Sequence, residues 1–96
     1  MTCAYIIADV TVTNAEQMAA YRVWSTQAMQ EFGVEVLVRG GAIEVLEGEW
    51  SPTRIVVLKF PSIAAARTYY DSATYTHARQ VREGAGVMRM VVVEGI

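Results

Sequence analysis

The segment Arg39-Gly40-Gly41 interrupts a hydrophobic run and places a guanidinium beside flexible backbone. The planar guanidinium of Arg39 can hold a carboxylate or an enolate oxygen, and glycines let a ligand approach the backbone closely. We therefore expect Arg39 to bind substrate and polarise it during catalysis, with Gly40 and Gly41 as neighbouring substrate-binding positions. The other interpretation is a turn in which Arg39 pairs with Glu44 or Glu47.

Two side chains are candidates for catalytic proton transfer. His77 is the only histidine, and imidazole is the side chain that ordinarily changes charge near neutral pH. Its short helical context favours a solvent-exposed role instead. Asp9 stands on an otherwise apolar strand face, where carboxylates are usually paired. Asp9 is thus either a catalytic base or one half of an ion pair with Arg54, Lys59 or Arg89.

Three aromatic residues are candidate substrate-binding residues. Trp50 lies in an expected turn, where it caps a pocket, reaches a partner subunit or packs the turn onto the core. Tyr69 and Tyr70 lie in an expected helix, where tyrosines mainly pack. Their hydroxyls are also suited to line a cavity between helices and sheet.

The cysteine and histidine counts argue against a metal centre. Cys3 and His77 are single residues of their kinds, so a cysteine cluster, an intrachain disulfide and a protein-only zinc site are not expected. No phosphate loop, dinucleotide fingerprint or nucleophile elbow is present. We expect no metal and no cofactor.

Length and charge bound the class of protein. The 96 residues suit a single domain, residues 1–96. The net charge is −2 and the eight basic residues are scattered, which argues against nucleic-acid binding and membrane-surface attachment. The N-terminal segment does not have the pattern of a signal peptide, and no apolar run is long enough to span a bilayer. A cytoplasmic location is expected.

Hydrophobic periodicity predicts the elements that must position these side chains. Their order is β-α-β-(β)-β-α-(α)-β, typical of an α+β, ferredoxin-like split βαβ fold with the helices on one face of an antiparallel sheet. Asn14 and Ser62 are expected helix N-caps. The expected elements are a strand at 3–12, a helix at 14–33, two strand segments at 34–48 around Gly40-Gly41, a strand at 53–60, helices at 62–72 and 73–86, and a strand at 87–95.

The sheet face opposite the helices would be apolar, with Tyr5 and Ile7 in its first strand. A bare apolar face of four strands favours association. We expect a twofold homodimer in which two sheets pack face to face.

The stretch from Val38 to Tyr75 resembles the signature of a family known as domain of unknown function 1330. The matching pieces are Arg39-Gly40-Gly41, Glu44, Leu46-Glu47-Gly48, Trp50, Pro52, Arg54, Phe60-Pro61-Ser62, Ala66, Tyr70, Ser72 and Tyr75. The early "AAYRVW" and the final "EG" extend the resemblance over nearly the whole chain. Two departures are Gly33-Val34 in place of a paired glycine, and Tyr69-Tyr70 in place of the frequent Trp-Tyr.

The resemblance implies membership of the dimeric α+β barrel superfamily. That superfamily includes cofactor-free monooxygenases, muconolactone-type isomerases, small-molecule cyclases and stress-response proteins. Our first hypothesis is a pocket between sheet and helices that binds a small, partly apolar organic acid or aromatic metabolite. If the protein is an enzyme, cofactor-free isomerisation, cyclisation or oxygenation fits best, with Arg39 as the electrophilic group. The alternative is a non-catalytic, dimeric stress-response or ligand-binding module.

Overall fold

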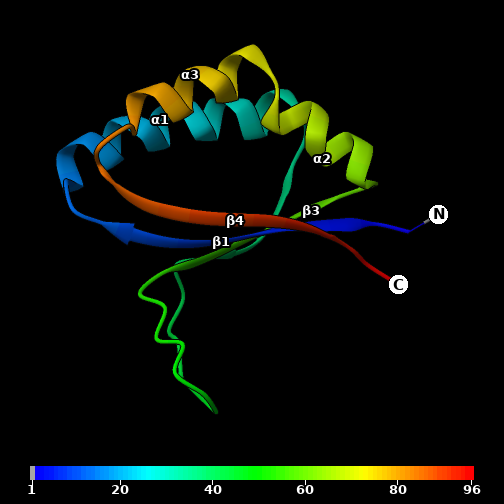
Figure 1. The fold of residues 1–96 in the computed structure, drawn as a ribbon. Coiled ribbons are helices and arrows are strands. Elements are labelled where there is room, and N and C mark those ends of the chain that lie inside the picture. Colours follow the sequence, from blue (N-terminus) through cyan, green and yellow to red (C-terminus); the bar gives the residue numbers. More distant parts are fainter. Residues whose placement is uncertain (1) are drawn as a thin grey trace.

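The fold is a four-stranded antiparallel sheet with three helices on one face (Figure 1), as described for residues 2–96 by a computed structural model. The strand order is β2-β3-β1-β4. This architecture confirms the expected α+β, ferredoxin-like class. The elements are β1 (Ala4–Val12), α1 (Ala15–Glu31), β2 (Glu35–Arg39), β3 (Ile55–Phe60), α2 (Ile63–Tyr70), α3 (Ala73–Val81) and β4 (Gly86–Glu94).

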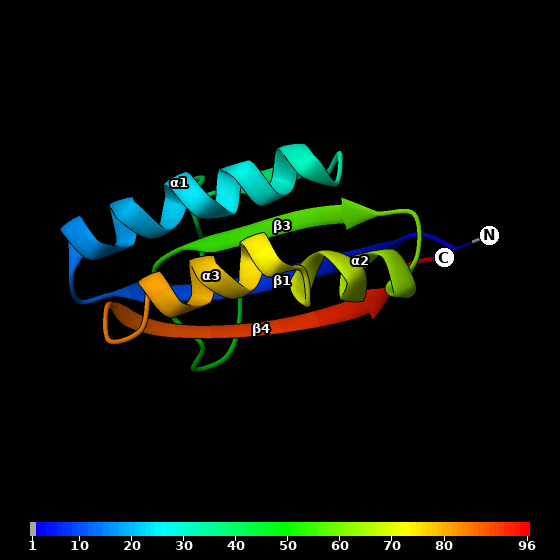
Figure 2. The ribbon, with the colours of Figure 1, turned by 90° about the horizontal axis from the view of Figure 1, so that it is seen from above.

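Each helix begins at a polar residue that caps its free backbone N–H groups. The Asn14 side chain accepts a hydrogen bond from the Gln17 amide at 3.0 Å, which confirms the expected cap of α1. Ser62 and Ser72 cap α2 and α3 in the same way. Seen from above, α1 runs beside α3, and α2 continues over the other end of the sheet (Figure 2).

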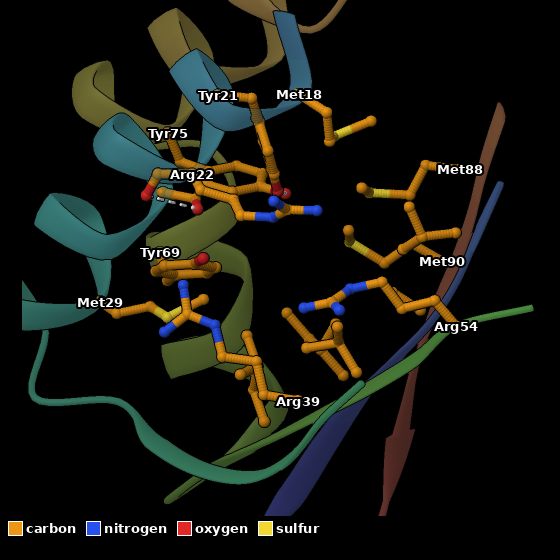
Figure 3. Close-up of a pocket in the computed structure, with 16 residues that line it drawn as sticks. Met18, Tyr21, Arg22, Met29, Arg39, Arg54, Tyr69, Tyr75, Met88 and Met90 are labelled. Atoms are coloured by element: carbon orange, nitrogen blue, oxygen red, sulfur yellow. Dashed lines mark hydrogen bonds between the residues drawn. The ribbon is translucent and has the colours of Figure 1, made fainter. Parts of the chain in front are cut away.

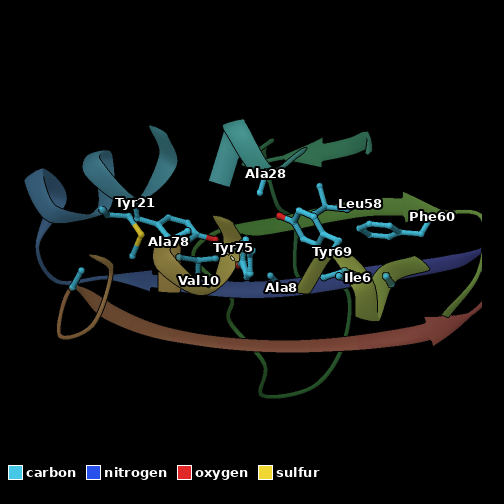
Figure 4. Packing of buried hydrophobic residues seen from close by; sticks show 13 residues of the cluster. Ile6, Ala8, Val10, Tyr21, Ala28, Leu58, Phe60, Tyr69, Tyr75 and Ala78 are labelled. Atoms are coloured by element: carbon cyan, nitrogen blue, oxygen red, sulfur yellow. Dashed lines mark hydrogen bonds between the residues drawn. The ribbon is translucent and has the colours of Figure 1, made fainter. Parts of the chain in front are cut away.

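The core lies between the helices and the inner face of the sheet (Figure 4). Small residues on β1, Ala4 and Ala8, allow the helical layer to approach closely. Tyr69 of α2 and Tyr75 of α3 fill the space above them, with ring centroids 4.8 Å apart. Each such buried ring contributes roughly 1.5–3 kcal/mol to stability.

One expected strand is wrong. The strand expected between Gly41 and Gly48 does not form. Residues 40–54 are instead a long loop that extends from the sheet on the side opposite the helices (green in Figure 1). The antiparallel partner of β2 is β3, which follows the loop, and not the segment directly after Gly41. Gly48, with a φ of +86°, and Pro52 further disfavour extended pairing. Leu46 is 96% exposed within this loop.

The outer sheet face carries large apolar side chains. Val87, Val91 and Val93 of β4 are 56%, 60% and 46% exposed. Their alternation with the inward-facing Met88 and Met90 is the period of two that a half-buried strand requires. Among residues 2–96, no helix combines the length and apolar character needed to cross a membrane.

Candidate functional site

A cavity of about 50 Å³ lies between α1 and the inner face of the sheet (Figure 3). The cavity walls are mainly apolar, and three arginine side chains form part of them. The lining residues are Ile6, Ala8, Val10, Met18, Tyr21, Arg22, Ser25, Met29, Arg39, Arg54, Val56, Leu58, Tyr69, Tyr75, Met88 and Met90. Since a water needs about 10–15 Å³ of such volume, the cavity holds roughly four atoms of that size.

A β-bulge in β2 directs Arg39 into this cavity. Val36 pairs with Leu58, but the register shifts at Leu37, so that Val38 pairs with Val57 and Arg39 with Val56. The extra residue reverses which face the following side chains take. Arg39 therefore shares the inner face with Val56, and its Nη2 donates a hydrogen bond to Thr26 Oγ1 of α1 at 2.9 Å.

Arg54 immediately precedes β3 and enters the cavity from the opposite side (Figure 3). Its carbonyl accepts a hydrogen bond from the Val10 amide at 2.9 Å, which fixes its backbone on β1. Its guanidinium lies against Gly40. Desolvation lowers the pKa of Arg54, and the positive charges of Arg22 and Arg39 lower it further.

The arginine charges have no carboxylate to balance them in the cavity. None of the lining residues is Asp or Glu. Within residues 2–96 the only ion pair joins Arg67 and Asp71 on α2, at 3.2 Å. The cavity thus combines a positive potential with apolar walls, which suits an anion that carries a hydrocarbon part.

Two tyrosine hydroxyls meet at the upper wall. Tyr21 and Tyr75 are buried and hydrogen-bonded to each other at 2.7 Å. Burial raises the pKa of Tyr75 well above its ordinary range, and the neighbouring Tyr21 adds to this. Burial likewise raises the pKa of Tyr69. The hydroxyls of Tyr69 and Tyr75 therefore stay protonated at physiological pH and are potential hydrogen-bond donors to an anion.

Four methionines give the cavity an adaptable wall. Met18 and Met29 come from α1, while Met88 and Met90 come from β4. Methionine is unbranched and changes rotamer readily. Rotamer changes of these side chains would enlarge the cavity without a change of fold.

The chemistry available at the cavity is electrophilic. Guanidinium groups and protonated hydroxyls stabilise negative charge that develops on an oxygen atom. The lining residues include no Asp, Glu, His, Lys or Cys that would act as a base. The described residues contain no group of three or more His, Cys, Asp and Glu side chains arranged to hold a metal ion.

The structure brings two of the candidate residues named from the sequence, Arg39 and Tyr69, to the cavity wall. Gly40 and Gly41 do not line the cavity. Gly40 contacts the guanidinium of Arg54, and a Cβ at Gly41 would meet nothing within 4 Å. Tyr70 packs outside the cavity, where the Arg79 guanidinium lies 4.2 Å from its ring centroid.

The remaining three candidates lie elsewhere. Asp9 points to the bare sheet face and accepts a hydrogen bond from Trp50 Nε1 at 3.1 Å. This pair, and not an ion pair with Arg54, Lys59 or Arg89, is the contact that Asp9 makes. His77 is exposed on α3 and packs edge-to-face on Trp24, with centroids 4.4 Å apart. Its exposure agrees with the solvent-exposed interpretation.

Sequence reasoning missed Arg22 and Arg54 as cavity residues. Arg22 lies in α1 between the apolar Tyr21 and Val23, and a helical arginine usually faces water. The sequence carries one signal, since the adjacent Tyr21 belongs to the apolar series Met18, Tyr21 and Ala28 at helical spacing, and the structure shows all three buried. Arg22 therefore borders the inward face of α1.

Comparison with known proteins gives the family and the fold. The model of the family "Domain of unknown function (DUF1330)" matches residues 3–96. No curated protein matches the chain. The three solved structures described below are at most 20% identical to this chain, so their similarity shows the fold alone.

A protein of unknown function from Rhodopseudomonas palustris superposes with a TM-score of 0.78 at 20% identity, over 99% of this chain and 83% of that one. SnoaB, a cofactor-independent oxygenase from Streptomyces nogalater, gives 0.65 at 6% identity, over 97% and 92%. A dimeric, ferredoxin-like protein of unknown function from Bacteroides fragilis gives 0.55 at 12% identity, over 97% and 95%.

Proposed function

The chain belongs to the DUF1330 family, and we propose that this member is a homodimer that binds a small, partly apolar organic acid in its arginine-lined cavity. The observation that carries the proposal is the convergence of Arg22, Arg39 and Arg54 on apolar walls without a carboxylate. A charge-assisted hydrogen bond to a guanidinium contributes roughly 1.5–3 kcal/mol. Two such bonds to Arg39 together contribute roughly 3–6 kcal/mol before the entropic cost of association, so we expect affinity in the millimolar range.

The homodimer part of the proposal rests on the bare sheet face. Val91 and Val93 form an apolar patch opposite the half-buried Ile7 and Tyr5 of β1, and Val87 lies on the same face beyond Arg89. Packing this face against the same face of a second copy about 10 Å away removes it from water. The Bacteroides fragilis neighbour, described as dimeric, has the same fold.

The binding proposal is tested by titrating the protein with propionate, a monocarboxylate close to the cavity in size. Arg39→Gln should weaken binding at least about tenfold, because it removes the charged fork. Arg67→Gln is the matched control, since Arg67 lies on α2 in its own ion pair with Asp71. Equal affinity of wild type and Arg39→Gln, with both melting normally, would contradict the proposal.

Cofactor-free catalysis is the second candidate function, and the electrophilic lining favours it. Arg39 and the protonated Tyr69 would stabilise an enolate oxygen, as enolisation in isomerisation, cyclisation or oxygenation requires. With no base among the lining residues, solvent would take the proton. Such a role predicts faster exchange of the methyl protons of pyruvate with deuterium oxide, followed by NMR. Arg39→Gln should abolish the acceleration.

The non-catalytic alternative is a dimeric ligand-binding or stress-response module. It predicts that propionate and pyruvate bind while the methyl protons of pyruvate exchange no faster than in buffer. The two functions are thus separated by one NMR experiment on the same sample.

A further inference from the structure

The three arginines of the cavity come from three separate parts of the fold. Arg22 descends from α1, Arg39 comes from the end of β2, and Arg54 comes from the residue before β3. Figure 3 shows the three guanidiniums pointing into one space from different directions. If a ligand carboxylate binds one of these guanidiniums, at least one of the other two guanidiniums still faces the rest of the ligand.

The charges in this space are far from balanced. Arg39 donates to a neutral hydroxyl, Thr26 Oγ1. Within residues 2–96, no side chain accepts a hydrogen bond from the guanidinium of Arg22 or Arg54. The depressed pKa of Arg54 has the same origin, since burial and the two neighbouring cations disfavour its charge. With three positive charges and no acid, a monoanion leaves two charges uncompensated, whereas a dianion leaves one.

The walls between the arginines are apolar. Val56, Met88 and Met90 line the sheet side, and Met29 lines the helix side. Burying a hydrocarbon spacer against them is favourable, while the compact cavity of about 50 Å³ limits its length. The two charges of the ligand should therefore be carried at two ends of a short chain.

We propose that the cavity selects a short dicarboxylate, one carboxylate held by Arg39 and the other by Arg54, with Arg22 facing the same space from the helix side. This inference rests on the proposed function, because it specifies the acid that the cavity binds. Inorganic phosphate has the same charge, but it has no apolar part to use the methionine walls.

The test compares malonate with monomethyl malonate by isothermal titration at low ionic strength. The ester keeps the carbon skeleton and loses one charge. Malonate should bind at least about tenfold more tightly, since each carboxylate gains its own bidentate guanidinium partner. Arg54→Gln should remove this advantage while the ester still binds, and Arg67→Gln should preserve it. Melting curves of both variants establish that they are folded; Arg22→Gln serves as a second probe if Arg54→Gln unfolds.

Each outcome decides something different. Equal affinity for malonate and its ester overturns the dicarboxylate proposal and leaves the monocarboxylate site standing. Absence of binding by malonate, the ester and propionate overturns both. Inorganic phosphate binding as tightly as malonate overturns the need for an apolar spacer and points to a phosphate site.

Discussion

Gly40 and Arg54 are in direct contact: a Cβ at position 40 would lie 2.7 Å from Cζ of the Arg54 guanidinium. Gly40 also has a φ of +74°, a backbone conformation that L side chains rarely adopt. The positive φ of the turn after β2 favours glycine at this position, and a side chain there would also displace the flexible end of Arg54. The sequence motif Arg39-Gly40-Gly41 links two cavity arginines, one by its own side chain and one by the space it leaves.

Gly40→Ala should lower the free energy of unfolding by about 1 kcal/mol or more, because alanine strains the backbone at this positive φ. The variant should also weaken propionate binding, because the added methyl group displaces the Arg54 guanidinium. Gly41→Ala is the matched control, since a Cβ there meets nothing within 4 Å. Urea unfolding and isothermal titration measure the two effects. Equal behaviour of the two variants would contradict the role assigned to Gly40.

The hydrogen bond between the hydroxyls of Tyr21 and Tyr75 predicts a coupled pair of mutations. Tyr21→Phe or Tyr75→Phe alone should destabilise the fold by roughly 1–3 kcal/mol, because each leaves one buried hydroxyl without its partner. The double variant should cost less than the sum of the two. Chemical unfolding of the four proteins gives the coupling energy, and strict additivity would show that the hydroxyls do not interact.

Alkaline pH should destabilise the protein through Tyr69 and Tyr75. Both have a pKa raised by burial, so above about pH 10, the ordinary value for tyrosine, the folded chain holds more protons than the unfolded one. Their contribution is fully present below that pH and is lost as the pH rises further. The free energy of unfolding should therefore fall above pH 10. Tyr69→Phe should reduce that slope; an unchanged slope would count against burial as its cause.

Val91→Glu should convert the proposed dimer to monomer, because it places a charge in the apolar patch of the outer sheet face, opposite Ile7. Val23→Glu is the matched control: Val23 is 66% exposed on α1, away from that face. Light scattering coupled to gel filtration reports the mass of each. A wild-type protein that is monomeric at micromolar concentration would refute the sheet-to-sheet arrangement directly.

The sequence predicts the elements of this fold better than the site. The capping residues Asn14 and Ser62 predict the starts of α1 and α2, and the alternation along 3–12 predicts β1. The strand expected after Gly41 is wrong because the alternation of Ile43 and Val45 does not tell which later segment pairs with β2, and that segment is β3.

The site depends on contacts between distant segments. Arg39 was a candidate by residue type, but Arg22 and Arg54 join it only once α1 and β3 are packed together. Asp9 looked like a buried acid in need of a cation, yet its neighbour is the Trp50 indole, contributed by a loop 41 positions along. Such pairings are set by tertiary structure, and no local pattern encodes them.

The unpaired Leu37 has a consequence for how related chains should be compared. Successive side chains of a strand point to opposite faces of the sheet. Adding or removing one residue between Val36 and Arg39 would therefore move Arg39 from the inner face to the outer face. A relative with the same Arg-Gly-Gly letters but without the extra residue would show its arginine to the opposite face, and its cavity would lose a charge. Chain length in this stretch, counted between Gly33 and Gly40, is therefore as informative as the letters themselves.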